Sequence, residues 1–304
     1  MSDPQQQIRG IVPPMPTPLL SRDELDIAGL ERLIEHLIGG GVHGIFILGS
    51  TGEGPSLSSK VQRELITRSC KLARSRVPVL VGITDTSFTD SLATARHAAD
   101  CGVFCTVFAP PYYFPLNQDE LLGYTRRLLA ELPLPAMLYN MPRMTKLSFE
   151  PATIEKLTDH RKIIGIKDSG GDLDYFRKII EVARARPDWS VFVGPERLLV
   201  DTVRLGGAGG VNGGGNVWPR LLVDLYEAAV KKDEAMIASL QAKLSQLGQI
   251  YNAVQQASNL VKGLKCALSL MGICSTTVAE PFTPSSPAEC DRARNILTEL
   301  GLLR

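Results

Sequence analysis

The chain lacks the features that mark several common classes of protein. Its charge is balanced, with 33 lysine and arginine residues against 32 aspartate and glutamate residues, so the composition indicates neither a nucleic-acid partner nor an anionic membrane surface. No apolar run reaches the roughly 18 residues of a membrane helix, and the first residues lack the apolar core of a signal peptide. We therefore expect a cytoplasmic protein that binds neither nucleic acid nor membrane.

Cysteine and histidine are sparse and are not spaced for a metal ion. The six cysteines include no Cys-x-x-Cys pair, and no histidine cluster stands near Cys101 and Cys105. Zinc sites and disulfide frameworks usually show such spacings. We expect reduced thiols that mostly fill the core, and no metal site.

What the sequence does contain is an alternation of short apolar runs with longer segments of helical periodicity. Strands are expected over residues 10–19, 44–48, 77–83, 103–108, 136–139, 163–168, 191–193 and 208–212. Helices are expected over residues 25–38, 58–74, 88–100, 117–132, 151–159, 173–185 and 197–205. Ser58 is expected to open one helix, and Asn117 with Glu120 resembles a capping box for another.

This alternation predicts an α/β fold, since parallel strands need crossover helices between them. Eight such units predict a (β/α)8 TIM barrel over residues 8–226, with an open doubly wound sheet as the alternative. Beyond residue 219 only helices are expected, over residues 221–231, 234–254, 259–271 and 287–300. We expect residues 227–304 to form a C-terminal helical region packed on the barrel.

A lysine stands at the end of the sixth expected strand. Lys167 follows the apolar run 163–166 and precedes Asp168. A buried lysine must be paired or lose its proton, and a neutral amine can attack a ketone to form a Schiff base. The alternative is a structural ion pair, for example with Asp168. This segment alone supports catalysis and structural pairing equally.

Other strand ends carry further candidate site residues, because the strand ends of a barrel share one mouth. The hydroxyls and N–H groups of residues 49–53, Gly-Ser-Thr-Gly-Glu, suit a carboxylate, although an ordinary strand-to-helix turn explains the same residues. The glycine-rich segment 206–215 leaves room for a ligand or for helix packing. A phosphate-binding loop is also conceivable there, although no Walker-type lysine follows it.

Taken together, three of these segments resemble a known family. Residues 49–53, 139–142 and 165–168 occur in order on the second, fifth and sixth expected strands, and Pro111-Tyr112-Tyr113 lies between them. The chain thereby resembles the dihydrodipicolinate synthase / N-acetylneuraminate lyase family of Schiff-base lyases, from about residue 8 to the last helix. The resemblance implies a (β/α)8 barrel, a homotetramer built from dimers, a keto acid and an aldehyde as partners, and no metal or organic cofactor.

The resemblance also implies roles for single residues. Lys167 matches the lysine that condenses with pyruvate or with the pyruvoyl part of a substrate, and Tyr139 matches the tyrosine that moves protons. Ser50 and Thr51 match the pair that holds the pyruvate carboxylate and connects Tyr139 to a relay. Tyr113 matches the tyrosine that a neighbouring subunit lends to that relay.

Gly194 and Val211 match backbone positions that line the pocket in the family.

The chain departs from the synthase branch of this family at one position. Dihydrodipicolinate synthases, however, usually have an arginine for a substrate carboxylate where this chain has Met144, next to Arg143. Condensation of pyruvate with aspartate semialdehyde is therefore kept as the alternative activity.

The chain departs from the sialic-acid branch as well. An acidic pair is replaced by Pro195-Glu196-Arg197, and two hydroxyl residues are replaced by Gly213 and Gly214. The remaining branch predicts retro-aldol cleavage of a 2-keto-3-deoxy sugar acid, or of a related 4-hydroxy-2-oxo acid, with Glu196, Arg197 and Met144 beside the substrate tail. A catalytically silent keto-acid-binding protein and a phosphate-dependent barrel enzyme are kept as competing hypotheses.

Overall fold

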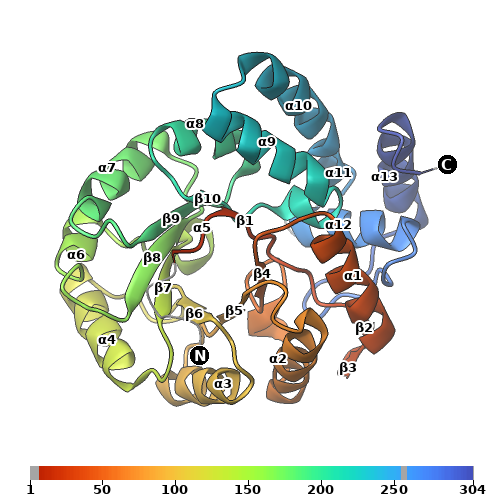
Figure 1. Cartoon of the computed structure of the whole chain (residues 1–304). Helices are drawn as coiled ribbons and strands as arrows, with labels where there is room; N and C mark the ends of the chain where they lie inside the picture. Colours follow the sequence, from red (N-terminus) through yellow and green to blue (C-terminus); the bar gives the residue numbers. More distant parts are fainter. Residues whose placement is uncertain (1–6, 255–258, 304) are drawn as a thin grey trace.

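The computed structural model describes residues 7–254 and 259–303, in which a ring of strands is surrounded by helices (Figure 1). Eight parallel strands follow the order β1-β10-β9-β8-β7-β6-β5-β4. The two outer strands, β1 (Gly10–Ile11) and β4 (Ile45–Ile47), meet through a parallel bridge between Pro14 and Phe46. There the N–H of Met15 donates to the Phe46 carbonyl at 2.8 Å, so the sheet closes. The expected (β/α)8 barrel is confirmed, and the open sheet is wrong.

The remaining strands of the barrel are β5 (Val79–Gly82), β6 (Cys105–Phe108), β7 (Ala136–Asn140), β8 (Ile163–Asp168), β9 (Ser190–Val193) and β10 (Gly209–Gly210). The surrounding helices are α1 (Ile27–Gly39), α2 (Ser59–Ala73), α3 (Phe88–Asp100), α4 (Gln118–Glu131), α6 (Pro151–Glu155), α7 (Leu173–Ala183), α8 (Leu199–Arg204) and α9 (Pro219–Lys231). One apolar cluster, which includes Phe46, Met137 and Phe192, fills the barrel, and a larger one lies between strands and helices. Burial on both faces explains the continuous apolar runs of these strands.

Local signals placed several helix starts correctly. The side chain of Ser58 caps α2 by accepting from the N–H of Val61. Asn117 and Glu120 form the expected capping box at α4. These caps satisfy N–H groups that the first turn of a helix cannot pair internally.

Other boundaries differ from the prediction. The segment 10–19 does not continue as a strand, because its prolines remove the N–H groups that a sheet needs. It leads instead into an antiparallel hairpin of β2 (Leu19–Ser21) and β3 (Glu24–Leu25), so α1 begins only after its cap, Asp26. The expected helix 234–254 is divided into α10 (Glu234–Leu247) and α11 (Gln249–Asn252), and a short helix α5 (Pro142–Thr145) was not expected.

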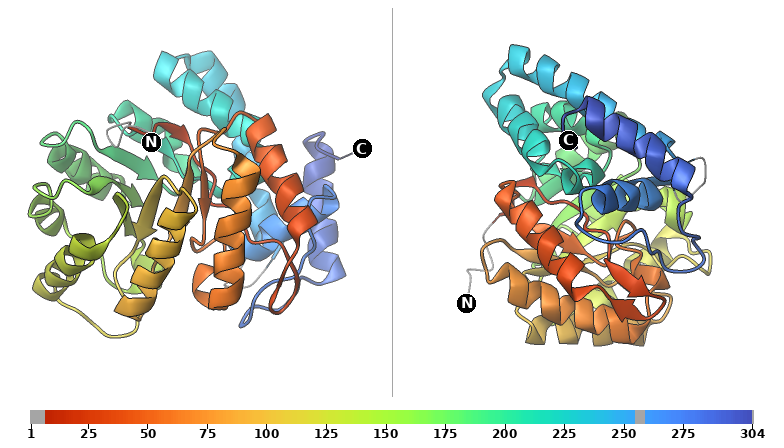
Figure 2. Two further views of the ribbon diagram at one scale, coloured as in Figure 1. Left: turned by 60° about the horizontal axis from the view of Figure 1, so that its bottom comes forward. Right: turned by 90° about the vertical axis from the view of Figure 1, so that its right-hand side faces the viewer.

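The C-terminal helices α10, α11, α12 (Asn259–Leu270) and α13 (Pro287–Glu299) lie to one side of the barrel, and α12 and α13 lie near α1 (Figure 2). Arg32 of α1 donates to the carbonyl of Ile273 at 2.9 Å across this contact. A domain boundary at residue 226 stays a prediction. In the part of the chain that the structure describes, none of the helices has the length and hydropathy to cross a membrane.

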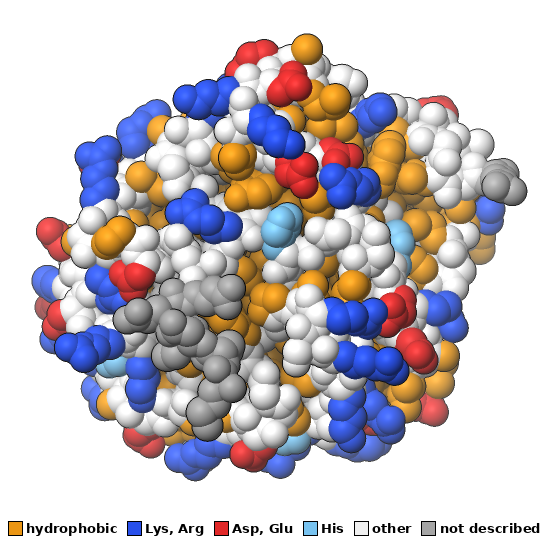
Figure 3. Space-filling view, in the orientation of Figure 1, with side chains coloured by type: hydrophobic (Ala, Val, Ile, Leu, Met, Phe, Trp, Pro, Cys, Tyr) orange, Lys and Arg blue, Asp and Glu red, His pale blue; other side chains and the backbone are white. Residues whose placement is uncertain are grey.

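Basic and acidic side chains are interspersed over the face drawn in Figure 3. Hydrophobic side chains show between them. This distribution agrees with the balanced charge of the sequence.

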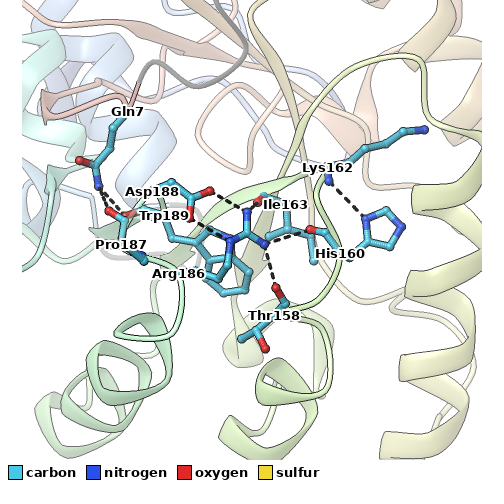
Figure 4. Close-up of polar contacts among 9 residues, drawn as sticks. All are labelled: Gln7, Thr158, His160, Lys162, Ile163, Arg186, Pro187, Asp188 and Trp189. Atoms are coloured by element: carbon cyan, nitrogen blue, oxygen red, sulfur yellow. Dashed lines mark hydrogen bonds and ion pairs between the residues drawn. The ribbon is translucent and has the colours of Figure 1, made fainter.

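Arg186 joins the segments that lead into β8 and β9 (Figure 4). Its guanidinium donates to the carbonyls of Thr158, His160 and Ile163 at 2.8, 3.3 and 3.2 Å. It also pairs with Asp188 at 2.6 Å, and its side chain is only 18% exposed. One side chain therefore forms hydrogen bonds with three carbonyls of the segment that leads into β8.

Arg186→Ala should lower the free energy of unfolding by about 2–4 kcal/mol, because it leaves part-buried carbonyls unpaired. Urea unfolding followed by circular dichroism measures the change. Arg184→Ala is the matched control: Arg184 pairs with Glu181 but is 73% exposed, so its loss should cost less than about 0.5 kcal/mol. Equal losses in the two variants would contradict a special role for Arg186.

Candidate active site

Lys167 and Tyr139 lie side by side where β8 and β7 end. The two residues are register partners in the parallel sheet. Lys167 is 4% exposed and Tyr139 is 5% exposed. The Nζ atom of Lys167 lies 4.0 Å from the centroid of the Tyr139 ring and 4.9 Å from that of Phe46. The structure thus places the amine in an enclosed aromatic environment inside the barrel.

Asp168 does not supply the ion pair considered for Lys167. Consecutive strand residues point to opposite faces, and the Asp168 carboxylate accepts from Asn140 at 2.8 Å and from the N–H of Gly170 at 3.0 Å. Burial raises the pKa of Asp168, although both hydrogen bonds oppose the shift. Among the described residues, Asp168 therefore belongs to a separate polar cluster behind the strand.

The Tyr139 hydroxyl lies near two serine hydroxyls. Burial alone would raise its pKa, but the charge of Lys167 and hydrogen bonds with Ser50, Ser169 and Lys167 together hold the pKa below its ordinary value. Of these serines, Ser169 was missed from sequence, although it follows Lys167 by two residues and so shares its strand face. A Cβ added to Gly194 would lie 2.1 Å from the Ser169 Oγ, so this close approach requires a glycine.

Ser50 and Thr51 lie in the loop after β4, between two residues with left-handed backbone. Leu48 and Glu53 both have a φ of 58°. This conformation costs a non-glycine residue about 1–2 kcal/mol, so it persists only where the surroundings determine it. Ser50 is half-buried and Thr51 is buried. The strained loop brings Ser50 to Tyr139, as the predicted relay requires.

The predicted tail residues are divided between buried and exposed positions. Glu196 accepts from the N–H of Gly214 at 2.7 Å and lies near the Tyr251 hydroxyl; burial raises the pKa of Glu196, and these two polar neighbours oppose the rise. Arg197 is exposed, and its guanidinium donates to the carbonyl of Gly171 at 3.3 Å. Val211 is buried in the cluster that contains Tyr139. The link from Glu196 to Tyr251 joins residues far apart in sequence and was not predicted.

Met144 and Tyr113 lie at the surface. Met144, on α5, is 51% exposed. Tyr113 is 75% exposed and packs edge-on against Phe114, with 5.1 Å between ring centroids. Both aromatics line an open groove of about 840 Å³ with Phe88 and Tyr124. Within residues 7–254 and 259–303, no hydrogen bond or ring contact joins Tyr113 to Tyr139.

No metal centre is apparent in the described ranges, where no group of three or more histidine, cysteine, aspartate or glutamate side chains is arranged around a common point. The six cysteines are free. The polar groups that converge near Lys167 are hydroxyls. They suit hydrogen bonding and proton transfer to a small organic substrate.

Comparisons with known proteins agree with this geometry. A model of the dihydrodipicolinate synthetase family matches residues 7–300. The solved dihydrodipicolinate synthase of Bacteroides thetaiotaomicron is 48% identical, with a TM-score of 0.93 and coverage of 96% of this chain and 98% of that one. A 4-hydroxy-tetrahydrodipicolinate synthase of Methanospirillum hungatei is 31% identical over 95% of this chain and 98% of that protein.

A relative with another named activity is about as similar to this chain as the Methanospirillum hungatei protein is. The Escherichia coli protein named "Putative 2-dehydro-3-deoxy-D-gluconate aldolase YagE" is 33% identical over 96% of this chain and 97% of its own length. Its crystal structure in complex with pyruvate has a TM-score of 0.91 and covers 97% of this chain and 99% of that one. Overall similarity therefore identifies a family that contains both synthases and aldolases, and leaves the reaction to the site residues.

Proposed function

Because the chain belongs to the dihydrodipicolinate synthetase family and is thus a lyase, we propose that it makes or consumes pyruvate through a Schiff base at Lys167. The observation that carries this proposal is the buried Lys167 amine, 4.0 Å from the centre of the Tyr139 ring. A lysine amine enclosed in the barrel beside a tyrosine hydroxyl is placed to attack the ketone of a bound keto acid. The YagE crystal structure contains pyruvate, which supports a keto acid as the ligand of this site.

The proposed reaction is a retro-aldol cleavage. The Lys167 amine attacks the ketone carbon and water leaves, which forms an iminium ion. The iminium withdraws the electron pair of the C3–C4 bond as that bond breaks, leaving an enamine and an aldehyde. Tyr139 takes the proton of the C4 hydroxyl, a role that its lowered pKa supports, and returns a proton to C3 of the enamine. Water then hydrolyses the resulting imine, which releases pyruvate and restores the Lys167 amine. The imine itself accepts the electrons, so the proposed chemistry uses neither a metal nor an organic cofactor.

Ser50, Ser169 and Thr51 complete the proposed site. Ser50 and Ser169 contact the Tyr139 hydroxyl and are suited to pass its proton on. Thr51, with backbone N–H groups of its loop, is suited to hold the pyruvate carboxylate. This set of nucleophile, acid–base group and carboxylate site also argues against a catalytically silent keto-acid-binding protein.

Borohydride trapping tests the Schiff base directly. Incubation with pyruvate and borohydride should add one pyruvate-derived mass per chain, and peptide mapping should place it on Lys167. Reduction without pyruvate is the control and should add nothing. Labelling of a different lysine, or no labelling at all, would reject the proposed mechanism.

We favour a 2-keto-3-deoxy sugar acid, or a related 4-hydroxy-2-oxo acid, as the substrate, with dihydrodipicolinate synthesis as the alternative. The choice rests on Met144, which offers an apolar side chain where a synthase would need an arginine for a carboxylate. Arg143 next to it is exposed on α5. Arg197 already donates to the Gly171 carbonyl. The Glu196 carboxylate, beside Gly214 and Tyr251, is better suited to a hydroxylated tail than to a carboxylate.

With saturating pyruvate, kcat/KM for aspartate semialdehyde should be at least about tenfold below that for glyceraldehyde. A missing charge-assisted contact forfeits about 1.5–3 kcal/mol, and methionine cannot offset the desolvation of a carboxylate. Met144→Arg should narrow the difference, while Met144→Leu, which matches it in size and adds no charge, should not. A tenfold preference for the semialdehyde in the wild type would identify a lysine-pathway synthase.

We further propose a cytoplasmic homotetramer built from dimers, in which Tyr113 reaches the active site of a neighbouring subunit. The exposed Tyr113 and Phe114 support this, since such apolar surfaces usually meet a partner. Sedimentation should detect a tetramer, and Tyr113→Ala should lower kcat by about tenfold or more. Leu20→Ala, which removes another exposed apolar side chain, should retain activity. A fully active monomer would contradict the proposal.

A further inference from the structure

A buried ion pair connects the C-terminal helices to the loop that carries Ser50 and Thr51. The Nζ atom of Lys265, on α12, lies 2.5 Å from Oε1 of Glu53, and both side chains are 0% exposed. The second carboxylate oxygen of Glu53 accepts from the N–H of Ala279 at 2.6 Å. Each oxygen of this carboxylate is therefore bound by a group from the C-terminal part of the chain.

These contacts act on a residue whose backbone is strained. Glu53 has φ 58° and ψ 21°, a left-handed conformation that glycine adopts readily and glutamate does not. Such a conformation persists where surrounding contacts over-determine it. Here the contacts come from Lys265 and Ala279, and the neighbouring Gly52 carbonyl accepts from the Thr17 hydroxyl at 2.6 Å.

We propose that Glu53 and Lys265 are positioning residues for the keto-acid site. Their ion pair holds the backbone of residue 53 in the left-handed region, and this conformation places Ser50 and Thr51 for the substrate carboxylate. The inference rests on the proposed function in one respect, namely that pyruvate is the ligand that these residues hold. In this arrangement the C-terminal helices contribute to substrate binding without contacting the substrate.

A second ion pair on the same helix provides a matched comparison. Lys262 of α12 lies 3.5 Å from Glu289 of α13, and their side chains are 1% and 11% exposed. This pair also links C-terminal elements in a largely buried environment. It joins α12 to α13, whereas the pair of Lys265 joins α12 to the loop after β4. Loss of either pair should lower stability, but only loss of the Glu53 pair should change pyruvate binding.

Two double variants separate the backbone effect from the loss of charge. Each contains Lys265→Met, which avoids an unpaired buried cation and keeps the volume, combined with Glu53→Ala or Glu53→Gly. Glu289→Gln is the control. For each protein, the half-saturating pyruvate concentration is taken from borohydride trapping at Lys167. The assay temperature is kept well below the Tm of that protein. Hydrogen exchange of residues 49–54 is measured in parallel.

In the Glu53→Ala double variant the half-saturating pyruvate concentration should be about tenfold or more above that of the wild type, because alanine disfavours the left-handed conformation. In the Glu53→Gly double variant the half-saturating pyruvate concentration should stay within about threefold of the wild-type value, because glycine adopts the left-handed conformation freely. Glu289→Gln should bind pyruvate normally despite a lower Tm. Wild-type binding in the alanine double variant, or equal weakening in the glycine one, would overturn the proposal.

The exchange measurement keeps the two proposals distinguishable. If the wild type forms no pyruvate adduct at Lys167, the proposed function fails. The positioning role is then decided by exchange alone: faster exchange of residues 49–54 with alanine than with glycine at position 53 supports it, and equal exchange overturns it.

Discussion

Replacing Lys167 with alanine should lower kcat by at least about 10⁴-fold, the scale of a lost covalent nucleophile. The proposed reaction passes through an imine at this amine, and no other lysine Nζ lies over the Tyr139 ring in the described structure. The methyl group of alanine can neither form the imine nor accept the electrons of the breaking bond. Pyruvate release from a 2-keto-3-deoxy sugar acid, coupled to lactate dehydrogenase, measures the loss.

Lys162→Ala is the matched control for this experiment. Lys162 precedes the same strand, and its amine caps the carbonyls of Leu129 and Leu132 at 3.0 and 2.6 Å. Its loss should cost stability while leaving kcat within about threefold of the wild type. Substantial activity in Lys167→Ala, or a pyruvate adduct on another lysine of that variant, would reject the Schiff-base mechanism.

Tyr139→Phe should lower kcat by about 10²–10⁴-fold, which is the usual contribution of a positioned acid or base. Phenylalanine keeps the ring that lies edge-on to Phe46, with 6.4 Å between centroids, so the fold and the surroundings of Lys167 should persist. Borohydride trapping should show that the variant still binds pyruvate. A loss of tenfold or less would assign Tyr139 a positioning role.

The pH dependence gives a second measure of the same group. The pKa of the Tyr139 hydroxyl is lowered, because the charge of Lys167 and the serine hydrogen bonds outweigh the effect of burial. The phenolate that accepts the C4 proton should therefore form below the ordinary tyrosine pKa of about 10. The rate should rise with pH through this lowered pKa in the wild type, and this rise should be absent from Tyr139→Phe. Tyr226→Phe, whose ring packs edge-on against His43 outside the site, should retain the wild-type profile.

The sequence alone was sufficient to predict the fold class and that Lys167 and Tyr139 lie near each other, while their catalytic roles stay a prediction. Alternating apolar runs and helical segments require parallel strands with crossover helices, whatever the later packing. Lys167 and Tyr139 are each the last residue but one of such a strand, and strand ends in a barrel meet at one mouth. These conclusions depend on local periodicity and on chain order, which a sequence contains explicitly.

Only the tertiary structure decided which polar groups meet. The side chains of Lys167 and Asp168 point to opposite faces of β8. The Asp168 carboxylate accepts a hydrogen bond from Asn140 and does not pair with Lys167. The ion pair between Glu53 and Lys265 joins segments with no local signal of their proximity. A buried charge is tolerated only where a partner reaches it, and which partner does so is determined by packing between elements that lie far apart in the chain.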